Sequence, residues 1–263
     1  LPNYREYYEK RWFAHGRDCI GLTIKCGARE VPFGTDLLFE ASDLAGFVFG
    51  VEICEDFWSP NPPGTLAALA GATILLNLSA SNIVIGKADE RALLCASQSA
   101  RAMAAYVFTA SGWGESTTDL AWDGQATVHE LGAKLAEGER FGLNGGLTIC
   151  DVDVDRIGQD RLRNGTFADC ARRELGTAGF DRVLFEAREA APTDLIRPLD
   201  RFPFVPDDPA RLDRDCYEAF NIQVQGLMKR MVATGSKTVV IGISGGLDST
   251  QALLVACRAF DRL

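Results

Sequence analysis

The sequence predicts an α/β protein, because buried strands alternate with helices along most of the chain and a glycine-rich loop joins a strand to a helix near its end. Runs of Val, Ile and Phe are separated by Ala- and Leu-rich segments through residues 47–110, and the glycine-rich loop lies at residues 244–249. Alternation of this kind is typical of a sheet with helices on its faces. We expect two domains, the second of which contains the loop.

The first segments are expected to form a short helix and then strands. In residues 1–13, Tyr4, Tyr8 and Trp12 recur at the i, i+4 spacing that places side chains on one face of a helix. The strands are expected at residues 20–25, 36–40 and 47–58. The last of these ends abruptly at Cys54-Glu55-Asp56, before the turn SPNPPG.

Helices and strands then alternate. We expect a helix in TLAALAG, a strand in ATILLNLS, and a helix and a strand within GKADERALLCASQSARAMAAYVFTAS. The segment GWGESTTDLAWDGQATVHELGAKLAEGERF is expected to form a loop and an antiparallel hairpin with Gly-Ala at its turn. In GGLTICDVDVDRIGQDRL a strand is expected to run into a helix. The first domain therefore mixes sheet directions.

Proline and charge density indicate a linker between the two domains. We expect the first domain over residues 1–186, the linker over 187–211 and the second domain over 212–263. Asp213 is the expected cap of a helix that ends at Gly235. Its apolar residues repeat at helical spacing and are expected to be core: Tyr217, Phe220, Val224, Leu227, Met228 and Met231.

Composition excludes several classes of function. A net charge of −9 and a pI near 4.9 argue against a nucleic-acid partner. No apolar run approaches the ~18 residues that span a bilayer, so we expect a soluble protein with no membrane partner. The 8 cysteines form no CxxC pair and only 2 histidines accompany them, which argues against zinc and against a disulfide framework and is typical of the cytoplasm. Because the chain begins with Leu1 rather than Met, it is expected to start within a longer sequence.

The segment SGGLDS at residues 244–249 predicts a phosphate-binding loop. It lies between the expected strand at residues 237–244 and a helix, and Gly245 and Gly246 permit a tight turn whose amides face an anion at the helix N-terminus. It is not a Walker A loop, because the lysine of that motif is absent. Ser244 and Ser249 are expected to donate hydroxyls to phosphate, and Asp248 to hold Mg²⁺ or orient the loop. A plain glycine turn is the alternative.

Cys54 is a candidate nucleophile, because a sharp turn at a strand end exposes the sulfur and the thiolate is the attacking species. Position alone does not distinguish it from a structural cysteine, since buried cysteines are common. The alternative of a purely structural role therefore stays open at this point.

The two motifs, in their order along the chain, resemble known families. SGGLDS is similar to the pyrophosphate loop of N-type ATP pyrophosphatases, which adenylate a substrate oxygen before a nitrogen nucleophile displaces AMP. ICEDFW, with LPNYREYYEKR before it and NLSASNIVIGKADER, GESTTDLAWDGQ and SGGLDST after it, resembles the glutamine-dependent NAD synthetases, whose glutaminase domain is of the nitrilase family. The resemblance extends over essentially the whole chain.

The resemblance implies a nitrilase-type α-β-β-α sandwich that lacks its N-terminal strands, followed by the start of an adenine nucleotide α-hydrolase-like domain. It also implies a ligase that makes NAD from deamido-NAD, ATP and glutamine, with Mg²⁺ and no prosthetic group, in the cytoplasm and as a homo-oligomer. Cys54 matches the nucleophile that forms a thioester with the glutamyl carbonyl and releases ammonia.

Other positions match substrate contacts of that family. The glutamine-binding positions are Tyr4, Glu55, Ser81 and Lys87, with Glu9 as an auxiliary acidic position. Lys87 stands where an arginine can occur, and a lysine lacks the planar guanidinium that binds a carboxylate through two parallel hydrogen bonds. The ATP-binding positions are Ser244, Gly245, Gly246, Leu247, Asp248 and Ser249, with Asp248 also the Mg²⁺ position.

The family's oxyanion lysine and general-base glutamate are expected upstream of Leu1, so the 263-residue chain by itself is expected to be inactive. Three alternatives stay open. One is a GMP-synthetase-like amidotransferase, although VEICEDF lacks the glycines of its nucleophile turn. The others are a catalytically silent scaffold of nitrilase fold and an ordinary nucleotide-binding protein.

Overall fold

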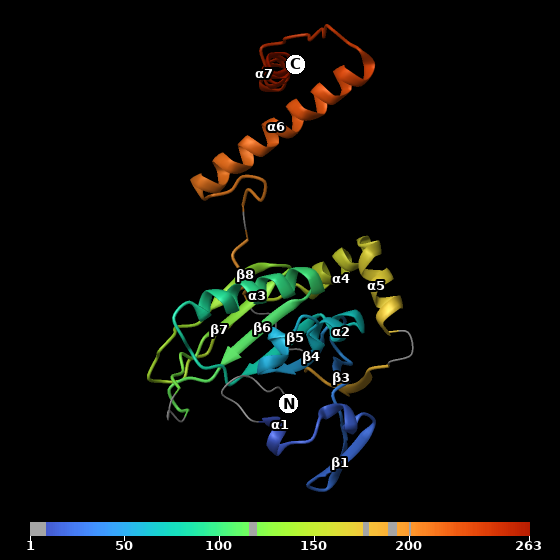
Figure 1. Ribbon diagram of the computed structural model, residues 1–263, viewed down its shortest axis with the longest axis vertical. Coiled ribbons are helices and arrows are strands. Elements are labelled where there is room, and N and C mark those ends of the chain that lie inside the picture. Colours follow the sequence, from blue (N-terminus) through green and yellow to red (C-terminus); the bar gives the residue numbers. More distant parts are fainter. Residues whose placement is uncertain (1–8, 116–119, 176–178, 189–193, 200) are drawn as a thin grey trace. The chain divides into compact units, whose positions relative to one another are not determined.

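The computed structural model describes residues 9–115, 120–175, 179–188, 194–199 and 201–263 (Figure 1). The chain divides into two units, Leu1–Pro198 and Leu199–Leu263. The boundary lies inside the expected linker, and the first unit extends to Pro198 because the Asp151 carboxylate accepts hydrogen bonds from the amides of Ile196 and Arg197.

Unit 1 is built on a seven-stranded mixed sheet of order β8-β7-β6-β5-β4-β3-β9. Its central strands β4, β5 and β6 are parallel to one another, β9 is parallel to β3, and the remaining neighbours are antiparallel. The strands are β3 (Leu37–Ala41), β4 (Val48–Ile53), β5 (Ile74–Ser79), β6 (Ala105–Ala110), β7 (Ala126–Glu130), β8 (Ala133–Glu137) and β9 (Asp181–Phe185). The α/β class and the mixed strand directions are confirmed.

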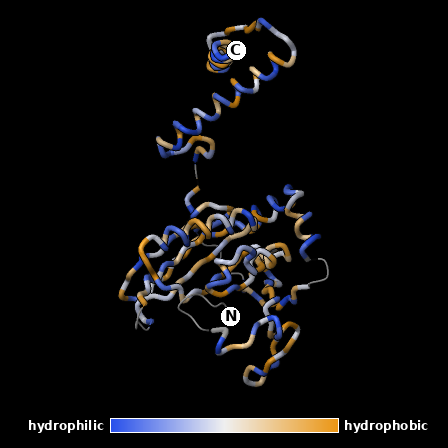
Figure 2. Tube along the Cα trace, viewed as in Figure 1, coloured by the Kyte–Doolittle hydropathy of each residue, from blue (hydrophilic) through white to orange (hydrophobic). Residues whose placement is uncertain are grey.

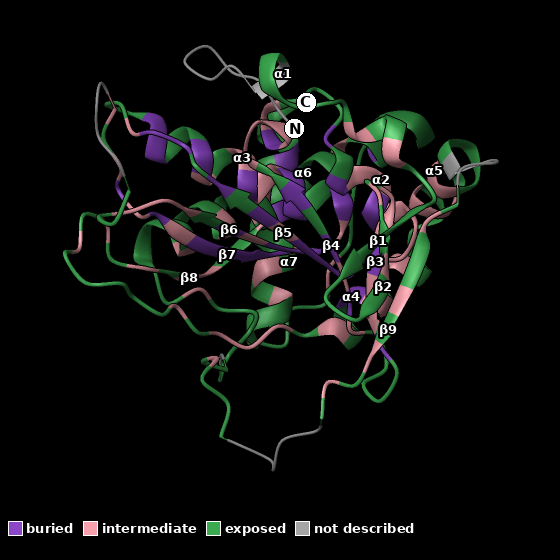
Figure 3. Cartoon of the chain, turned by 90° about the horizontal axis from the view of Figure 1, so that it is seen from below, coloured by how far each residue is buried: buried purple, intermediate pink, exposed green. Residues whose placement is uncertain are grey.

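Helices α2 (Pro63–Leu69) and α3 (Lys87–Ala102) cover one face of this sheet. Alternate residues of the central strands, including Leu75, Tyr106 and Phe108, are buried there against alanines of α2 and α3. Buried residues lie along these strands and along α3 in Figure 3. The sheet therefore has one fully packed face, towards which Glu52 and Asn77 also point.

The opposite face is covered only in part. Ile157 of α4 (Val154–Arg163) packs against Ile74 and Ala105 near the amino ends of the central strands. Val51 and Leu78, further along the strands, are 40% and 52% exposed. An apolar strip of sheet therefore lies open within the described residues.

The smaller elements of unit 1 are α1 (Glu9–Trp12), the 3₁₀ helices η1 (Gly16–Cys19) and η2 (Cys54–Trp58), the hairpin of β1 (Leu22–Cys26) and β2 (Arg29–Phe33), and α5 (Gly165–Leu175). β2, β9 and α5 were not expected from the sequence. It was also wrong to expect a strand before α4, since residues 145–153 are not in a strand, and the hairpin turn is Leu131-Gly132 rather than Gly-Ala.

Unit 2 contains two helices, α6 (Pro209–Thr234) and α7 (Leu247–Arg262). Hydrophilic and hydrophobic residues alternate along α6 (Figure 2), whose Val224 and Met231 pack on Val255 and Ala259 of α7. Gly235 ends α6 in the left-handed conformation, as expected, but the cap is Asp208 rather than Asp213 because Pro209 suits the first helical position. Tyr217, expected in the core, is exposed.

The expected strand at residues 237–244 is not a strand in the structure. A strand needs a hydrogen-bonding neighbour, and this apolar segment pairs with no other strand among the described residues. Sequence pattern alone detects the strand tendency of a segment but not the presence of its partner.

Candidate active site

Cys54 lies directly after β4, at the first position of η2. Its φ of 50° is in the left-handed region, which costs a residue with a side chain about 1–2 kcal/mol. The turn is held by Asp56, whose carboxylate accepts a hydrogen bond from the Ile53 amide at 3.0 Å, and by the buried ring of Phe57. The fold therefore turns the chain sharply at the candidate nucleophile, as the sequence predicts.

The surroundings of the sulfur keep it protonated. Burial raises the pKa of the Cys54 thiol, and hydrogen bonds from the Ala80 amide and with the Ser79 hydroxyl oppose this less strongly. The neighbouring Glu55 carboxylate also raises it. Because the thiolate is the nucleophile, a base has to remove the thiol proton before attack.

Beneath Cys54 lies a buried polar cluster on β4, β5 and β6. The Glu52 carboxylate accepts hydrogen bonds from the Gly64 amide at 2.8 Å, from Asn77 Nδ2 at 3.4 Å and from the Tyr106 hydroxyl. Asn77 Nδ2 also lies 3.4 Å from the Cys54 carbonyl oxygen. This cluster was not expected from the sequence, although a Glu and an Asn inside apolar strands indicate buried polar residues.

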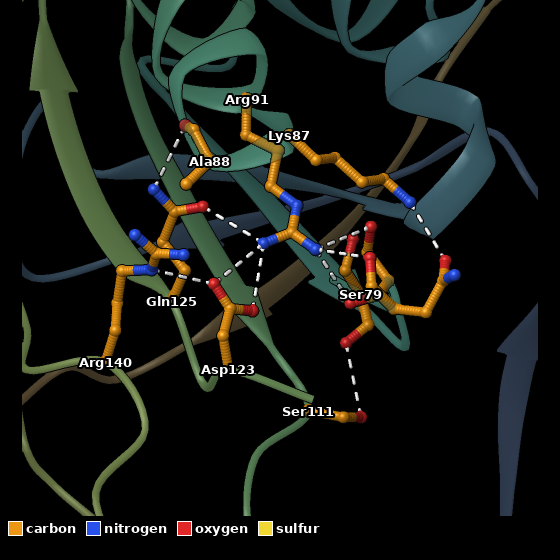
Figure 4. A network of polar contacts seen from close by, with 10 residues as sticks. Ser79, Lys87, Ala88, Arg91, Ser111, Asp123, Gln125 and Arg140 are labelled. Carbon is orange, nitrogen blue, oxygen red and sulfur yellow. Dashed lines mark hydrogen bonds and ion pairs between the residues drawn. The ribbon is translucent and has the colours of Figure 1, made fainter. Parts of the chain in front are cut away.

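Fully buried Arg91 organises the loop between β5 and α3 (Figure 4). Its Nη2 donates to the carbonyl oxygens of Ser81 and Asn82 at 2.8 and 2.9 Å, and its Nη1 binds both oxygens of Asp123 at 3.0 and 3.1 Å. Asp123 also accepts from Arg140 Nε at 2.9 Å. The loop is thus held by charge-assisted hydrogen bonds from a single side chain.

The same loop positions two of the expected glutamine contacts. The Ser81 hydroxyl is buried and accepts a hydrogen bond from Arg91 at 3.1 Å. Lys87, also buried, donates to Asn82 Oδ1 at 2.9 Å, and its Nζ lies 5.7 Å from the centroid of the Trp58 ring. Lys87 therefore extends from α3 to the helical turn that begins with Cys54.

The other expected contacts are described less fully. Glu55 follows Cys54 in η2 and is partly buried. Tyr4 lies outside the described residues, and Glu9 belongs to α1 without a described side chain. The structure thus brings Lys87 and Glu55 to the cysteine turn, and the glutamine-binding roles of all the expected contacts stay predictions.

The loop at residues 244–249 has the form of an anion cradle at a helix N-terminus. Gly245 has a φ of 85°, Gly246 caps α7, and the Ser244 and Ser249 hydroxyls lie 3.3 Å apart. Ser249 also donates to the Gly246 carbonyl oxygen at 3.1 Å. The Gly246 amide donates to Ser244 Oγ at 3.4 Å. These residues fit a phosphate group, because two hydroxyls lie at the helix N-terminus, where the helix dipole is positive.

A metal ion would need phosphate oxygens as additional ligands in this loop. Within the described ranges, no three His, Cys, Asp or Glu side chains are grouped so as to hold one. Asp248 in the first turn of α7 is a single carboxylate, and Mg²⁺ is commonly bound by one or two carboxylates together with substrate phosphates.

Among the described helices, none is long and apolar enough to cross a membrane.

The fold and the site define an α/β protein with a candidate cysteine nucleophile at the carboxyl end of a central parallel strand. No family model matches the chain. It is 57% identical over 265 residues to the glutamine-dependent NAD(+) synthetase of Mycobacterium bovis, 54% identical over 264 residues to that of Mycobacterium leprae and 28% identical over 266 residues to that of Thermotoga maritima. Each alignment covers 100% of this chain and 39% of the relative.

The chain is therefore homologous over its whole length to a section of the glutamine-dependent NAD(+) synthetases, and it spans 39% of their length. Solved structures similar to it include the NAD(+) synthetase of Cytophaga hutchinsonii, with 26% identity and a TM-score of 0.45 over 54% of this chain and 22% of that one. Another is yeast Nit3 of the nitrilase superfamily, with 24% identity and a TM-score of 0.38 over 44% of this chain and 41% of that one.

Proposed function

We propose that the full-length protein hydrolyses glutamine at Cys54 and uses the ammonia to convert deamido-NAD to NAD. The observation that carries the proposal is Cys54 itself, held in a left-handed turn at a strand end with its sulfur against Ala80 and Ser79. The 57% identity to a glutamine-dependent NAD(+) synthetase supplies the reaction class.

In the proposed glutaminase reaction a base removes the Cys54 proton and the sulfur attacks the amide carbon of glutamine. The tetrahedral oxyanion collapses, the C–N bond breaks, and ammonia leaves with the transferred proton. Water then hydrolyses the glutamyl thioester to glutamate and restores the thiol. By resemblance, Glu55, Ser81, Lys87, Tyr4 and Glu9 surround the glutamine, while a glutamate base and an oxyanion lysine complete the site.

In the proposed synthetase reaction the carboxylate of deamido-NAD is adenylated by ATP, with release of pyrophosphate, and ammonia then displaces AMP. The amides of Gly245, Gly246 and Leu247 and the hydroxyls of Ser244 and Ser249 would bind the phosphates. Asp248 would hold Mg²⁺, which neutralises phosphate charge. We also infer a homo-oligomer in the cytoplasm, by analogy with the family.

Cys54→Ala in the full-length protein tests the assignment. Glutamine-dependent NAD formation and glutamate release should fall to background, while NAD formation from added ammonia should persist, since the synthetase reaction does not use the thiol. Cys216→Ala, at an exposed cysteine of α6, is the matched control and should leave both activities intact. Glutamate release by the Cys54→Ala protein would refute the proposal.

A further inference from the structure

Glu52 is a carboxylate in a place where an unpaired charge is costly. It is 3% exposed, lies two residues before Cys54, and points to the face of the sheet that α2 covers. Burial raises the pKa of Glu52, and the hydrogen bonds from Tyr106, Gly64 and Asn77 counteract this only in part. Burying an ionised carboxylate costs several kcal/mol unless hydrogen bonds satisfy it, so three donors converge on this one group.

The hydrogen bonds continue from Glu52 to the nucleophile. Asn77 Nδ2 faces two acceptors, Glu52 Oε1 and the Cys54 carbonyl oxygen, each at 3.4 Å. Its Oδ1 therefore has to face a donor, and it accepts from the Ser79 hydroxyl at 2.6 Å. Ser79 in turn contacts the Cys54 sulfur. The orientation of one amide thus links the carboxylate to both the backbone and the side chain of Cys54.

We propose that Glu52 is a positioning residue for the Cys54 nucleophile. Its carboxylate, fixed by Tyr106 and the first turn of α2, orients Asn77, which holds the Cys54 carbonyl and Ser79 so that the left-handed turn keeps the sulfur in place. The inference rests on the proposed function of Cys54. A purely structural carboxylate would stabilise the fold but would not control the reactivity of the thiol.

Glu52→Gln in the full-length protein is the direct test. Glutamine keeps the shape but has one acceptor oxygen, so its NH₂ group faces a donor, Gly64 N–H, Tyr106 O–H or Asn77 Nδ2. We expect kcat for glutamine hydrolysis and the rate of Cys54 alkylation by iodoacetamide to fall by about 10- to 100-fold, as for a small displacement of a reacting group, with KM unchanged. Glu40→Gln on β3, at a partly exposed carboxylate outside the cluster, is the matched control and should change neither rate.

A double-mutant cycle separates positioning from stability. If Glu52 acts through Asn77, then Glu52→Gln should lower alkylation little further in an Asn77→Ala background, because the pathway is already broken. If Glu52→Gln does not fold, Tyr106→Phe replaces it as the test, because it removes only the hydroxyl that donates to Glu52. It should also lower kcat for glutamine hydrolysis and the rate of Cys54 alkylation.

Three results overturn the inference. The first is a folded Glu52→Gln protein whose kcat and alkylation rate are unchanged. The second is that the effects of Glu52→Gln and Asn77→Ala on the alkylation rate add in the double mutant. The third applies where Glu52→Gln does not fold, and it is a Tyr106→Phe protein in which both rates are unchanged. In each of these cases Cys54→Ala would still abolish glutamine hydrolysis and the proposed function would stand. If the Cys54→Ala protein still hydrolysed glutamine, both the proposed function and the positioning role of Glu52 would be refuted.

Discussion

At the scale of single residues, the candidate nucleophile is a thiol that its surroundings hold in the neutral form. Burial is the main cause, and the Ala80 amide and Ser79 hydroxyl only moderate it. A neutral resting thiol is protected from indiscriminate oxidation, because oxidation follows thiolate character. Near neutral pH it reacts slowly unless a base is placed beside it.

The pH dependence of alkylation follows from the raised pKa of Cys54. A raised pKa means that the thiolate forms at higher pH than in a free thiol, so the alkylation rate should still be rising where that of a cysteine in a short unstructured peptide has levelled off. The measurement is the rate of Cys54 modification by iodoacetamide between about pH 7 and pH 10, followed by mass spectrometry of the Cys54 peptide. If the rate at Cys54 levelled off at the same pH as that of the peptide cysteine, or at a lower pH, the prediction would be contradicted.

Arg91 provides a second prediction at this scale. Arg91→Met leaves the buried Asp123 carboxylate with Arg140 as its remaining charged partner and removes the three hydrogen bonds from Arg91 to Ser81 and Asn82, so it should destabilise unit 1 by about 3–5 kcal/mol. Arg173→Met breaks an exposed ion pair with Glu174 and should cost about 0–1 kcal/mol. Hydrogen exchange at the amides of β5 and β6 measures both. If the two variants destabilised unit 1 equally, burial of the Arg91–Asp123 ion pair would not increase its contribution to stability.

The sequence predicts some of these residues and not others. Cys54 is identified by the strand that ends at it and by the resemblance of ICEDFW. Glu52 and Asn77 interrupt apolar strands and could have been singled out as buried polar residues. Arg91 could not, because its partner Asp123 is 32 residues away and an arginine on a helix is usually solvated.

At the scale of elements, β4 and α2 approach each other closely because Gly50 has no side chain between them. A Cβ added at Gly50 would lie 2.9 Å from Ala67 Cβ and 3.4 Å from a methyl group of Leu38. The first turn of α2 is then close enough for the Gly64 amide to bind Glu52. Packing of this strand and helix therefore also fixes the cluster beneath Cys54.

Gly50→Ala should lower the free energy of unfolding of unit 1 by about 1–3 kcal/mol, because an extra methyl group overpacks the interface. Gly158→Ala in α4 is the matched control: no atom lies within 4 Å of the added Cβ, and alanine in a helix should stabilise by about 0.5–1 kcal/mol. Urea unfolding followed by the fluorescence of the four tryptophans measures both. If Gly50→Ala left the free energy of unfolding unchanged, the close contact between α2 and β4 at Gly50 would be contradicted.

The elements that the sequence predicts are those with a strong local pattern. The helices α2, α3 and α6 and the strands β4, β5 and β6 were expected within a few residues of their observed limits. β9 was missed because an edge strand, here paired to β3 across more than 140 residues, carries only a weak pattern of its own. The segment 237–244 shows the reverse case, a strong strand pattern without a strand to pair with.

At the scale of the whole molecule, the sheet has one packed face and one face that is partly open. The order of strands and their directions follow from pairings that no local pattern records, although alternation of strands and helices indicated the class. α4 covers the amino ends of the central strands, and the apolar residues near their carboxyl ends are exposed. Exposed apolar sheet surface of this kind promotes association.

The exposed apolar residues of the open face predict that the 263-residue chain self-associates when it is produced as a separate polypeptide. Val51 and Leu78 lie on this face, 40% and 52% exposed, and the chain should self-associate through them as its concentration rises. The double substitution Val51→Thr and Leu78→Thr places at both positions a β-branched residue, which strands favour, and adds two hydroxyls to the surface. It should shift sedimentation velocity towards the monomer. Leu93→Gln, at a 70% exposed leucine on the outer side of α3, is the control and should change association little, because isolated apolar residues on a surface are common. Equal association of all three proteins would mean that another surface, and not this face of the sheet, drives self-association.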